Sequence, residues 1–147
     1  WAPEAIWRRI VPTKLAYFIA THGEINGHMI REEDFFPYLQ FIGKIDLRMF
    51  AKMLDYAARH TAEEFLPEIK VPTLIIAGER DTFTPGWLSD KMHQMIEGSE
   101  ILTVPRGSHT APIEMPQLTN LRLERWLLDH FSDYYPVVKA KPQAKSA

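Results

Sequence analysis

The apolar pattern of the chain changes near Ile69, from a helical period to short continuous runs. Residues 73–77 form a nearly unbroken apolar stretch that ends at Gly78, which is typical of a parallel strand covered on both faces. A helical stretch at 87–97 follows, and then a second strand-like run at 100–104. Two strands joined by a helix predict a βαβ unit with a right-handed crossover. The expected fold class is therefore α/β.

The first part of the chain has the period of helices instead. Residues 4–66 look helical, with interruptions at Pro12 and around 23–27, and Asp46 is placed to cap the helix that begins after it. One helical face is formed by Phe35, Phe36, Leu39 and Ile42, and a second by Leu47, Phe50, Leu54, Ala57 and Ala58.

These patterns divide the chain into three regions. We expect an all-helical region at 1–66 and an α/β region at 67–135, which closes with a long helix from about Glu114 to Phe131 that packs on the sheet. The tail at 136–147 has three lysines and two prolines with little apolar surface, which predicts disorder.

Composition excludes several classes of function. The 147 residues contain 17 basic and 19 acidic side chains, so the formal net charge of -2 provides no basic field for nucleic acid or an anionic membrane. The chain has no cysteine, which rules out disulfides and Cys-based zinc sites, and no apolar run long enough to cross a bilayer. We predict a soluble, cytoplasmic protein that binds neither nucleic acid nor a membrane.

An acid and a histidine follow the two predicted strands. Asp81 lies in the loop after the strand at 73–77, and His109 in the loop after the strand at 100–104. Because functional groups of open parallel sheets gather beyond the carboxyl ends of the strands, the two side chains are expected to meet. A carboxylate in contact with an imidazole fixes its tautomer and stabilises the imidazolium that forms when it takes a proton from a nucleophile.

Simpler interpretations of the same residues remain open. Asp81 can be a turn former that accepts hydrogen bonds from nearby amides, His109 can be a structural histidine, and Glu79 is the nearest rival acid. The remaining histidines have no spacing that would gather them around an ion, so we predict no metal and no cofactor; they are His22, His28, His60, His93 and His130.

The motifs around these two residues resemble those of the α/β-hydrolases. Residues 71–81 (Val-Pro-Thr-Leu-Ile-Ile-Ala-Gly-Glu-Arg-Asp) and 107–109 (Gly-Ser-His) are similar to the last two catalytic loops of that family, and Glu-Met-Pro at 114–116 is similar to its closing segment. The resemblance covers residues 67–131 and implies that Asp81 and His109 are the acid and the histidine of a catalytic triad.

The resemblance also suggests a role for the helical region. Residues 31–39 look like part of the cap that many members insert over the active site. Side chains of this region that can line an apolar pocket beneath such a cap are Phe35, Phe36, Tyr38, Phe41 and Met49, although the same stripe also suits ordinary helix packing.

The nucleophile of the family is absent from the sequence. No Gly-x-Ser-x-Gly motif occurs, and residues 23–27 have the two glycines at that spacing but place Ile25 between them. The chain begins with Trp1. We therefore expect a C-terminal part of a larger enzyme, inactive alone.

Two functions follow as hypotheses. The first is a serine-type hydrolase of ester, amide or related acyl bonds, whose parent enzyme takes a small apolar or acyl substrate, with acyl transfer, dehalogenation and cofactor-free peroxidation as other chemistries of the fold. The alternative is a non-catalytic remnant, or a module that binds a ligand or partner.

Overall fold

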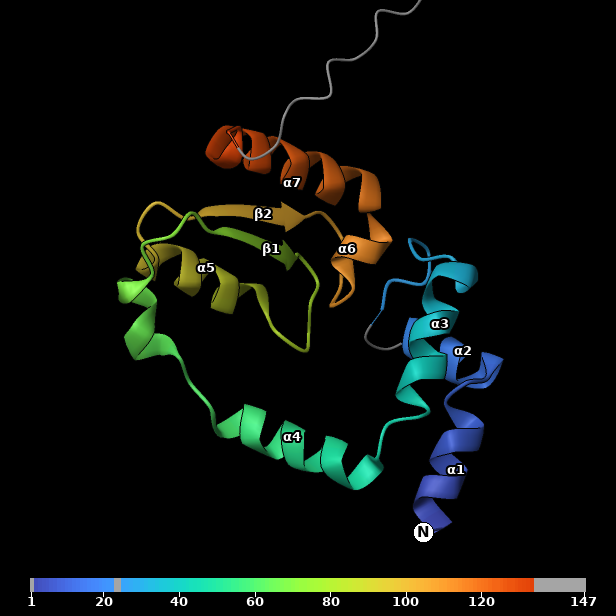
Figure 1. Cartoon of the computed structure of the whole chain (residues 1–147). Helices are drawn as coiled ribbons and strands as arrows, with labels where there is room; N and C mark the ends of the chain where they lie inside the picture. Colours follow the sequence, from blue (N-terminus) through green and yellow to red (C-terminus); the bar gives the residue numbers. More distant parts are fainter. Residues whose placement is uncertain (1, 23–24, 134–147) are drawn as a thin grey trace, which may run out of the picture.

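The computed structural model describes residues 2–22 and 25–133 (Figure 1). Helices make up its first part, as the apolar period predicts. They are α1 (Ala2–Ile10), α2 (Lys14–His22), α3 (Glu32–Ile42), α4 (Leu47–Arg59) and the 3-10 helix η1 (Glu63–Glu68). The predicted disordered tail at 136–147 lies outside the described residues.

Helices α1, α2 and α3 pack around a small apolar core. Phe35 and Leu39 of α3 are buried there against Val11 and Ile30. Phe35 is only 1% exposed, and burying such a side chain stabilises a fold by roughly 1.5–3 kcal/mol. The face predicted for α3 is therefore the one that packs.

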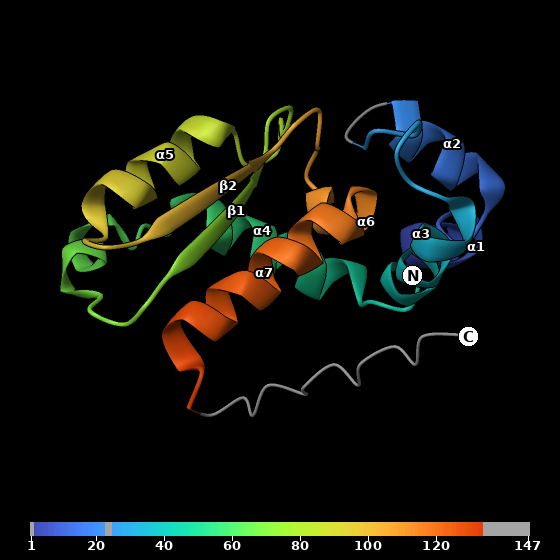
Figure 2. The ribbon, with the colours of Figure 1, turned by 90° about the horizontal axis from the view of Figure 1, so that it is seen from above.

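Helix α4 begins at the residue predicted from the sequence. The Asp46 carboxylate accepts hydrogen bonds from the backbone N–H groups of Arg48 and Met49, each at 2.9 Å. None of the residues of α4 is buried, although its apolar side chains have the period of one helical face. Figures 1 and 2 show α4 as an arm between the first helices and the sheet. The ring of Phe50 in α4 lies 6.3 Å from the ring of Trp7 in α1, but most of the large apolar side chains of α4 are exposed.

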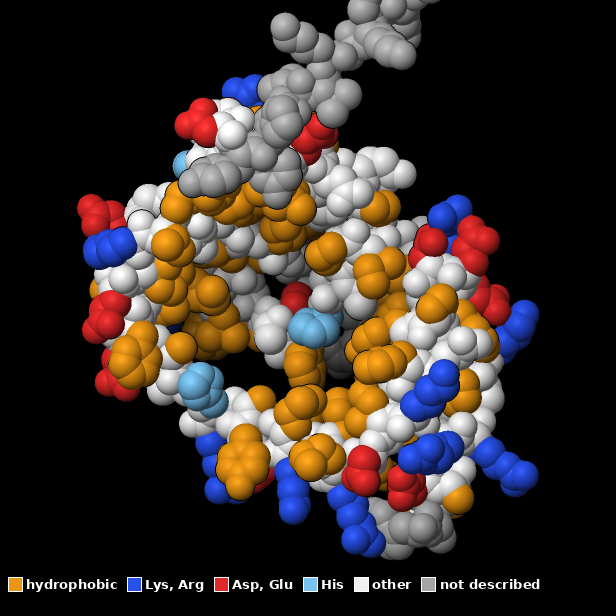
Figure 3. Space-filling view, in the orientation of Figure 1, with side chains coloured by type: hydrophobic (Ala, Val, Ile, Leu, Met, Phe, Trp, Pro, Cys, Tyr) orange, Lys and Arg blue, Asp and Glu red, His pale blue; other side chains and the backbone are white. Residues whose placement is uncertain are grey.

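Figure 3 shows the surface hollowed between this arm and the rest of the molecule, with hydrophobic side chains along the rim. The exposed apolar side chains of α4 are Met49, Met53, Leu54 and Tyr56.

The α/β region contains the predicted pair of parallel strands. Strand β1 (Leu74–Gly78) pairs with β2 (Glu100–Val104) in a register that runs from Leu74 opposite Glu100 to Gly78 opposite Val104. Helix α5 (Gly86–Met95) connects them and covers one face of the sheet. Both strands therefore deliver their following loops to the same edge.

The other face of the sheet is covered by the last helix, as expected (Figure 1). One helix from Glu114 was predicted, but the structure has two: α6 (Ala111–Glu114) and α7 (Pro116–Phe131). Met115 separates them with a non-helical backbone (φ -130°, ψ 63°), and Pro116 starts α7 because a first-turn residue needs no N–H donor. Within the described part, no helix combines the length and hydropathy needed to cross a membrane.

Candidate active site

Two loops meet at the carboxyl edge of the sheet: the acid loop, residues 79–85, and the histidine loop, residues 105–110. Backbone hydrogen bonds join them, from the amide of Glu79 to the carbonyl of Val104 at 3.1 Å and from the amide of Arg80 to the carbonyl of Gly107 at 2.8 Å. These two bonds tie the loops together beyond Gly78 and Val104, the last pair of the parallel register.

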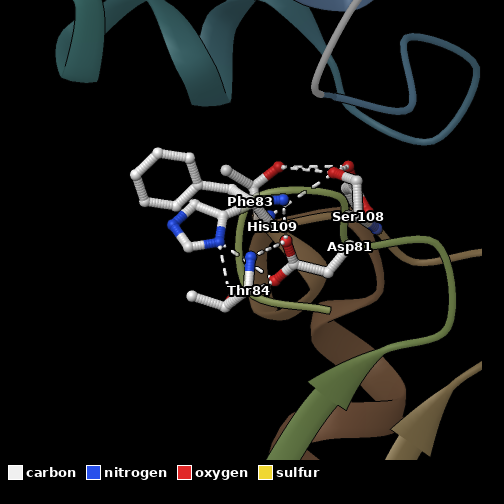
Figure 4. Close-up of polar contacts among 7 residues, drawn as sticks. Asp81, Phe83, Thr84, Ser108 and His109 are labelled. Atoms are coloured by element: carbon white, nitrogen blue, oxygen red, sulfur yellow. Dashed lines mark hydrogen bonds and ion pairs between the residues drawn. The ribbon is translucent and has the colours of Figure 1, made fainter. Parts of the chain in front are cut away.

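Asp81 and His109 contact each other across these loops (Figure 4). Nδ1 of His109 lies 3.0 Å from Oδ2 of Asp81, within hydrogen-bonding distance. The Asp81 side chain is 8% exposed, whereas the His109 side chain is 43% exposed. The carboxylate is thus largely covered, and the imidazole is open to a ligand or solvent on one side.

The two carboxylate oxygens of Asp81 have different partners. Oδ1 accepts hydrogen bonds from the backbone N–H groups of Phe83 at 2.9 Å and Thr84 at 2.8 Å. Oδ2 accepts from the Thr84 hydroxyl at 2.6 Å and faces His109. Asp81 is therefore a turn former through one oxygen and a histidine partner through the other.

These contacts keep Asp81 ionised. Burial on its own would raise the pKa of the Asp81 carboxyl, because it removes water from the charged form. The hydroxyl and amide of Thr84, together with His109, outweigh burial and leave the pKa below its ordinary value of 3.8. A negative carboxylate at neutral pH is the form that can stabilise an imidazolium beside it.

The ring of His109 is placed by Phe83 as well. The two rings contact edge to face, with centroids 4.8 Å apart and an interplanar angle of 62°. When Nδ1 carries the proton and donates to Asp81, Nε2 keeps its lone pair. In the described residues, Nε2 has no hydrogen-bond partner, so it is available to take a proton.

Ser108, the residue before His109, is not a free hydroxyl. Its side chain is buried and donates a hydrogen bond to Glu114. Ser89 lies in α5, Ser99 is hydrogen-bonded to His93, and Ser132 ends α7. Among the residues that the structure describes, no serine hydroxyl contacts His109; Ser146 lies outside them.

Glu79, the rival acid, does not face the histidine. Its Oε2 accepts a hydrogen bond from the backbone N–H of Arg106 at 2.6 Å. Arg106 has a φ of 58°, in the left-handed region that non-glycine residues seldom adopt. Glu79 thus holds the turn at the start of the histidine loop.

The apolar residues suggested as pocket lining lie in different surroundings. Phe35 belongs to the core of the first helices and presents almost no surface to a ligand. Phe36 lines an open groove of about 450 Å³ with Arg31, Glu32 and Glu33. Tyr38, Phe41 and Met49 are exposed, and their contact with a ligand stays a prediction.

Three residues of the site were not singled out from the sequence. Thr84 and Phe83 lie three and two positions after Asp81, and an Asp followed by Thr at that spacing is a signal for a side-chain-stabilised turn. Glu114 was noted only as part of a closing motif, and no local pattern marks it as buried. In the described part of the chain, no three His, Asp or Glu side chains are grouped to hold a metal ion.

Comparison with known proteins identifies the family to which this chain is similar. A family model for α/β-hydrolases described as "TAP-like protein" matches residues 51–129. Pimeloyl-(acyl-carrier protein) methyl ester esterase of Neisseria meningitidis is 32% identical over 56 residues, which are 38% of this chain and 22% of that protein. Serine hydrolase BPHL of Homo sapiens is 31% identical over 81 residues, 55% of this chain and 27% of BPHL.

Two solved structures share the fold. The enol-lactonase from Burkholderia xenovorans LB400 has a TM-score of 0.63 and 21% identity, covering 86% of this chain and 49% of the lactonase chain. A thermophilic esterase from Thermogutta terrifontis has a TM-score of 0.62 and 22% identity, and the match covers 88% of this chain and 50% of the esterase chain. The chain therefore spans half or less of the length of the proteins it matches.

Proposed function

The chain belongs to the TAP-like family of α/β-hydrolases, and we propose that Asp81 and His109 are the acid and the base of a serine-type hydrolase. The observation that carries this proposal is the 3.0 Å contact between Nδ1 of His109 and Oδ2 of Asp81, beyond the ends of two adjacent parallel strands. The free Nε2 on a ring that is 43% exposed supports the proposal, because this nitrogen can face a reacting group.

The proposed mechanism uses this asymmetry. Asp81 holds the tautomer in which Nδ1 is protonated, so that Nε2 accepts the proton of a serine hydroxyl as its oxygen attacks an acyl carbon. The imidazolium that results is stabilised by the Asp81 carboxylate, and it returns the proton to the leaving group. Water then hydrolyses the acyl-enzyme by the same route.

The serine is proposed to come from polypeptide beyond the described residues, since the serines within them are engaged or distant from His109. Residues 1–66 are proposed to act as a cap, with Tyr38, Phe41 and Met49 towards the substrate. An ester or lactone of a small apolar acyl group is the proposed substrate class, supported by the esterases and the lactonase that the chain resembles.

The natural reading frame around the coding sequence provides a direct test. We expect it to encode a Gly-x-Ser-x-Gly turn upstream of residue 1, and the protein made from that frame to hydrolyse p-nitrophenyl esters of short acyl chains. The substitution His109→Ala should then lower kcat/KM by about a thousandfold or more without changing the melting temperature.

A matched control is His130→Ala, which removes another exposed histidine near the end of α7, outside the proposed cap, and should leave kcat/KM unchanged. A frame without the serine turn, or hydrolysis that survives in the His109→Ala variant, would refute the proposal and favour a binding module of the same fold.

A further inference from the structure

Glu114 is a buried carboxylate close to the candidate site. It ends the short helix α6, five residues after His109, and is only 5% exposed. Burying a charge is unfavourable unless hydrogen bonds replace the lost water. In the described residues no basic side chain pairs with Glu114, so its charge is compensated by N–H and O–H donors alone.

Three of these donors come from the two neighbours of His109 in the sequence. The backbone N–H of Ser108 donates to Oε2 of Glu114 at 2.7 Å, and the Ser108 hydroxyl donates to Oε1. The hydroxyl of Thr110 also donates to Oε1, at 3.0 Å. The carboxylate therefore holds both sequence neighbours of His109, and Figure 4 shows Ser108 and its hydrogen bonds next to the histidine.

The fourth donor comes from the helical region. The backbone N–H of Asn26, 88 positions away in the sequence, donates to Oε1 of Glu114 at 2.9 Å. The side-chain amide of Asn26 also donates to the carbonyl oxygen of Arg106 in the histidine loop, at 3.0 Å. Figures 1 and 2 both place the described residues just before α3 beside the loop that precedes α6.

We propose that Glu114 is a positioning residue: its carboxylate links the docking of the helical region to the placement of His109. One carboxyl group fixes Asn26 and both neighbours of His109, so displacement of the Asn26 segment changes the support of the imidazole. The catalytic meaning of this link rests on the proposed function, whereas the link itself is a property of the folded chain.

Replacement by glutamine separates this role from simple space filling. A carboxamide has one oxygen and one NH2 group, but the carboxylate accepts a backbone N–H on each of its two oxygens. Whichever way the amide of a Glu114→Gln variant turns, its NH2 group faces the N–H of either Ser108 or Asn26. Side-chain volume is nearly unchanged, and one backbone donor loses its acceptor.

The test uses the unmodified chain and its Glu114→Gln variant, labelled with nitrogen-15. We expect the amide of Ser108 or Asn26 to exchange its hydrogen about 10- to 100-fold faster in the variant, as the loss of a hydrogen bond to a charged acceptor implies. We also expect the His109 ring signals to move from one dominant Nδ1-protonated tautomer to a mixture, because the contact with Asp81 loosens.

The control is Glu124→Gln on the exposed side of α7, which should alter neither measurement. Unchanged exchange at both amides would overturn the proposal. So would faster exchange with an unchanged His109 tautomer, since Glu114 would then only anchor the helical region. Both measurements are independent of ester hydrolysis, so they test the role of Glu114 even in a chain that has no activity.

A second variant applies if Glu114→Gln fails to fold. Thr110→Val removes one hydroxyl donor to Oε1 while keeping both backbone hydrogen bonds and the shape of the side chain. We expect the His109 tautomers to shift in the same direction by a smaller amount, and an unchanged tautomer population would contradict the proposed link.

Discussion

The α-carbon of Gly78 lies against the carbonyl oxygen of Ser108, so closely that a Cβ atom on Gly78 would overlap that oxygen. The same Cβ would lie 2.7 Å from the carbonyl oxygen of Gly107. Gly78 is the last residue of β1, and Ser108 precedes His109. The missing side chain of Gly78 is therefore what allows the histidine loop to approach the acid loop.

Substituting Gly78 by alanine is expected to push the two loops apart. The overlap involves backbone atoms, which cannot rotate away, so we expect a loss of roughly 1–3 kcal/mol in the free energy of unfolding, measured by urea denaturation. Gly86→Ala is the matched control, because a Cβ there meets nothing within 4 Å. Equal stabilities of the two variants would contradict the close approach.

The ionised Asp81 should make stability depend on pH. Because its pKa is lower in the folded state than its ordinary value of 3.8, its contribution is complete above that value and is lost as pH falls from there through the folded pKa. Asp81→Asn should be less stable than the unmodified chain at pH 7 by about 1–2 kcal/mol, and the gap should close in acid. A gap that stays constant down to pH 2, in urea titrations, would exclude this origin.

The cap of α4 offers a local test. Asp46→Ala removes the acceptor for the amides of Arg48 and Met49, and no buried residue of α4 compensates. We expect hydrogen exchange of the first-turn amides of α4 to become several-fold faster. Asp55→Ala, which breaks an exposed pair with Arg59 later in the same helix, should leave those amides nearly unaffected.

The left-handed backbone of Arg106 predicts an unusual gain from glycine. Arg106→Gly should raise the free energy of unfolding, by up to about 1 kcal/mol, because glycine adopts positive φ without the Cβ conflict. Arg80→Gly, in the neighbouring acid loop, should lower it by roughly 0.5–1 kcal/mol through the added freedom of the unfolded chain. Thermal unfolding of the two variants should therefore shift in opposite directions.

Several features followed from local sequence. The apolar runs at 73–77 and 100–104 predicted the two strands within one residue, and Asp46 was identified as the cap of α4. Asp81 and His109, 28 positions apart, were predicted to meet, and they are in contact because a βαβ unit delivers both loops to one edge of the sheet. Such features depend on neighbours in the chain, where side-chain period and turn chemistry are directly visible.

Other features were decided only by packing. The sequence favoured Asp81 and left Glu79 as the nearest rival acid, and the tertiary structure turns Glu79 to the amide of Arg106 and Asp81 to His109. It also leaves every residue of α4 at least partly exposed, although the apolar period of this helix is that of a packed helix.

The contact between Glu114 and Asn26 was beyond sequence reasoning altogether. Periodicity and motif spacing describe interactions along a strand, a helix or a turn. They do not show which distant backbone N–H group becomes buried in the folded chain and then needs an acceptor. The local sequence thus determined the elements and the order of the acid and the histidine. The choice of partners for the buried carboxylates was made by the three-dimensional arrangement, because only there does the need to satisfy a desolvated charge arise.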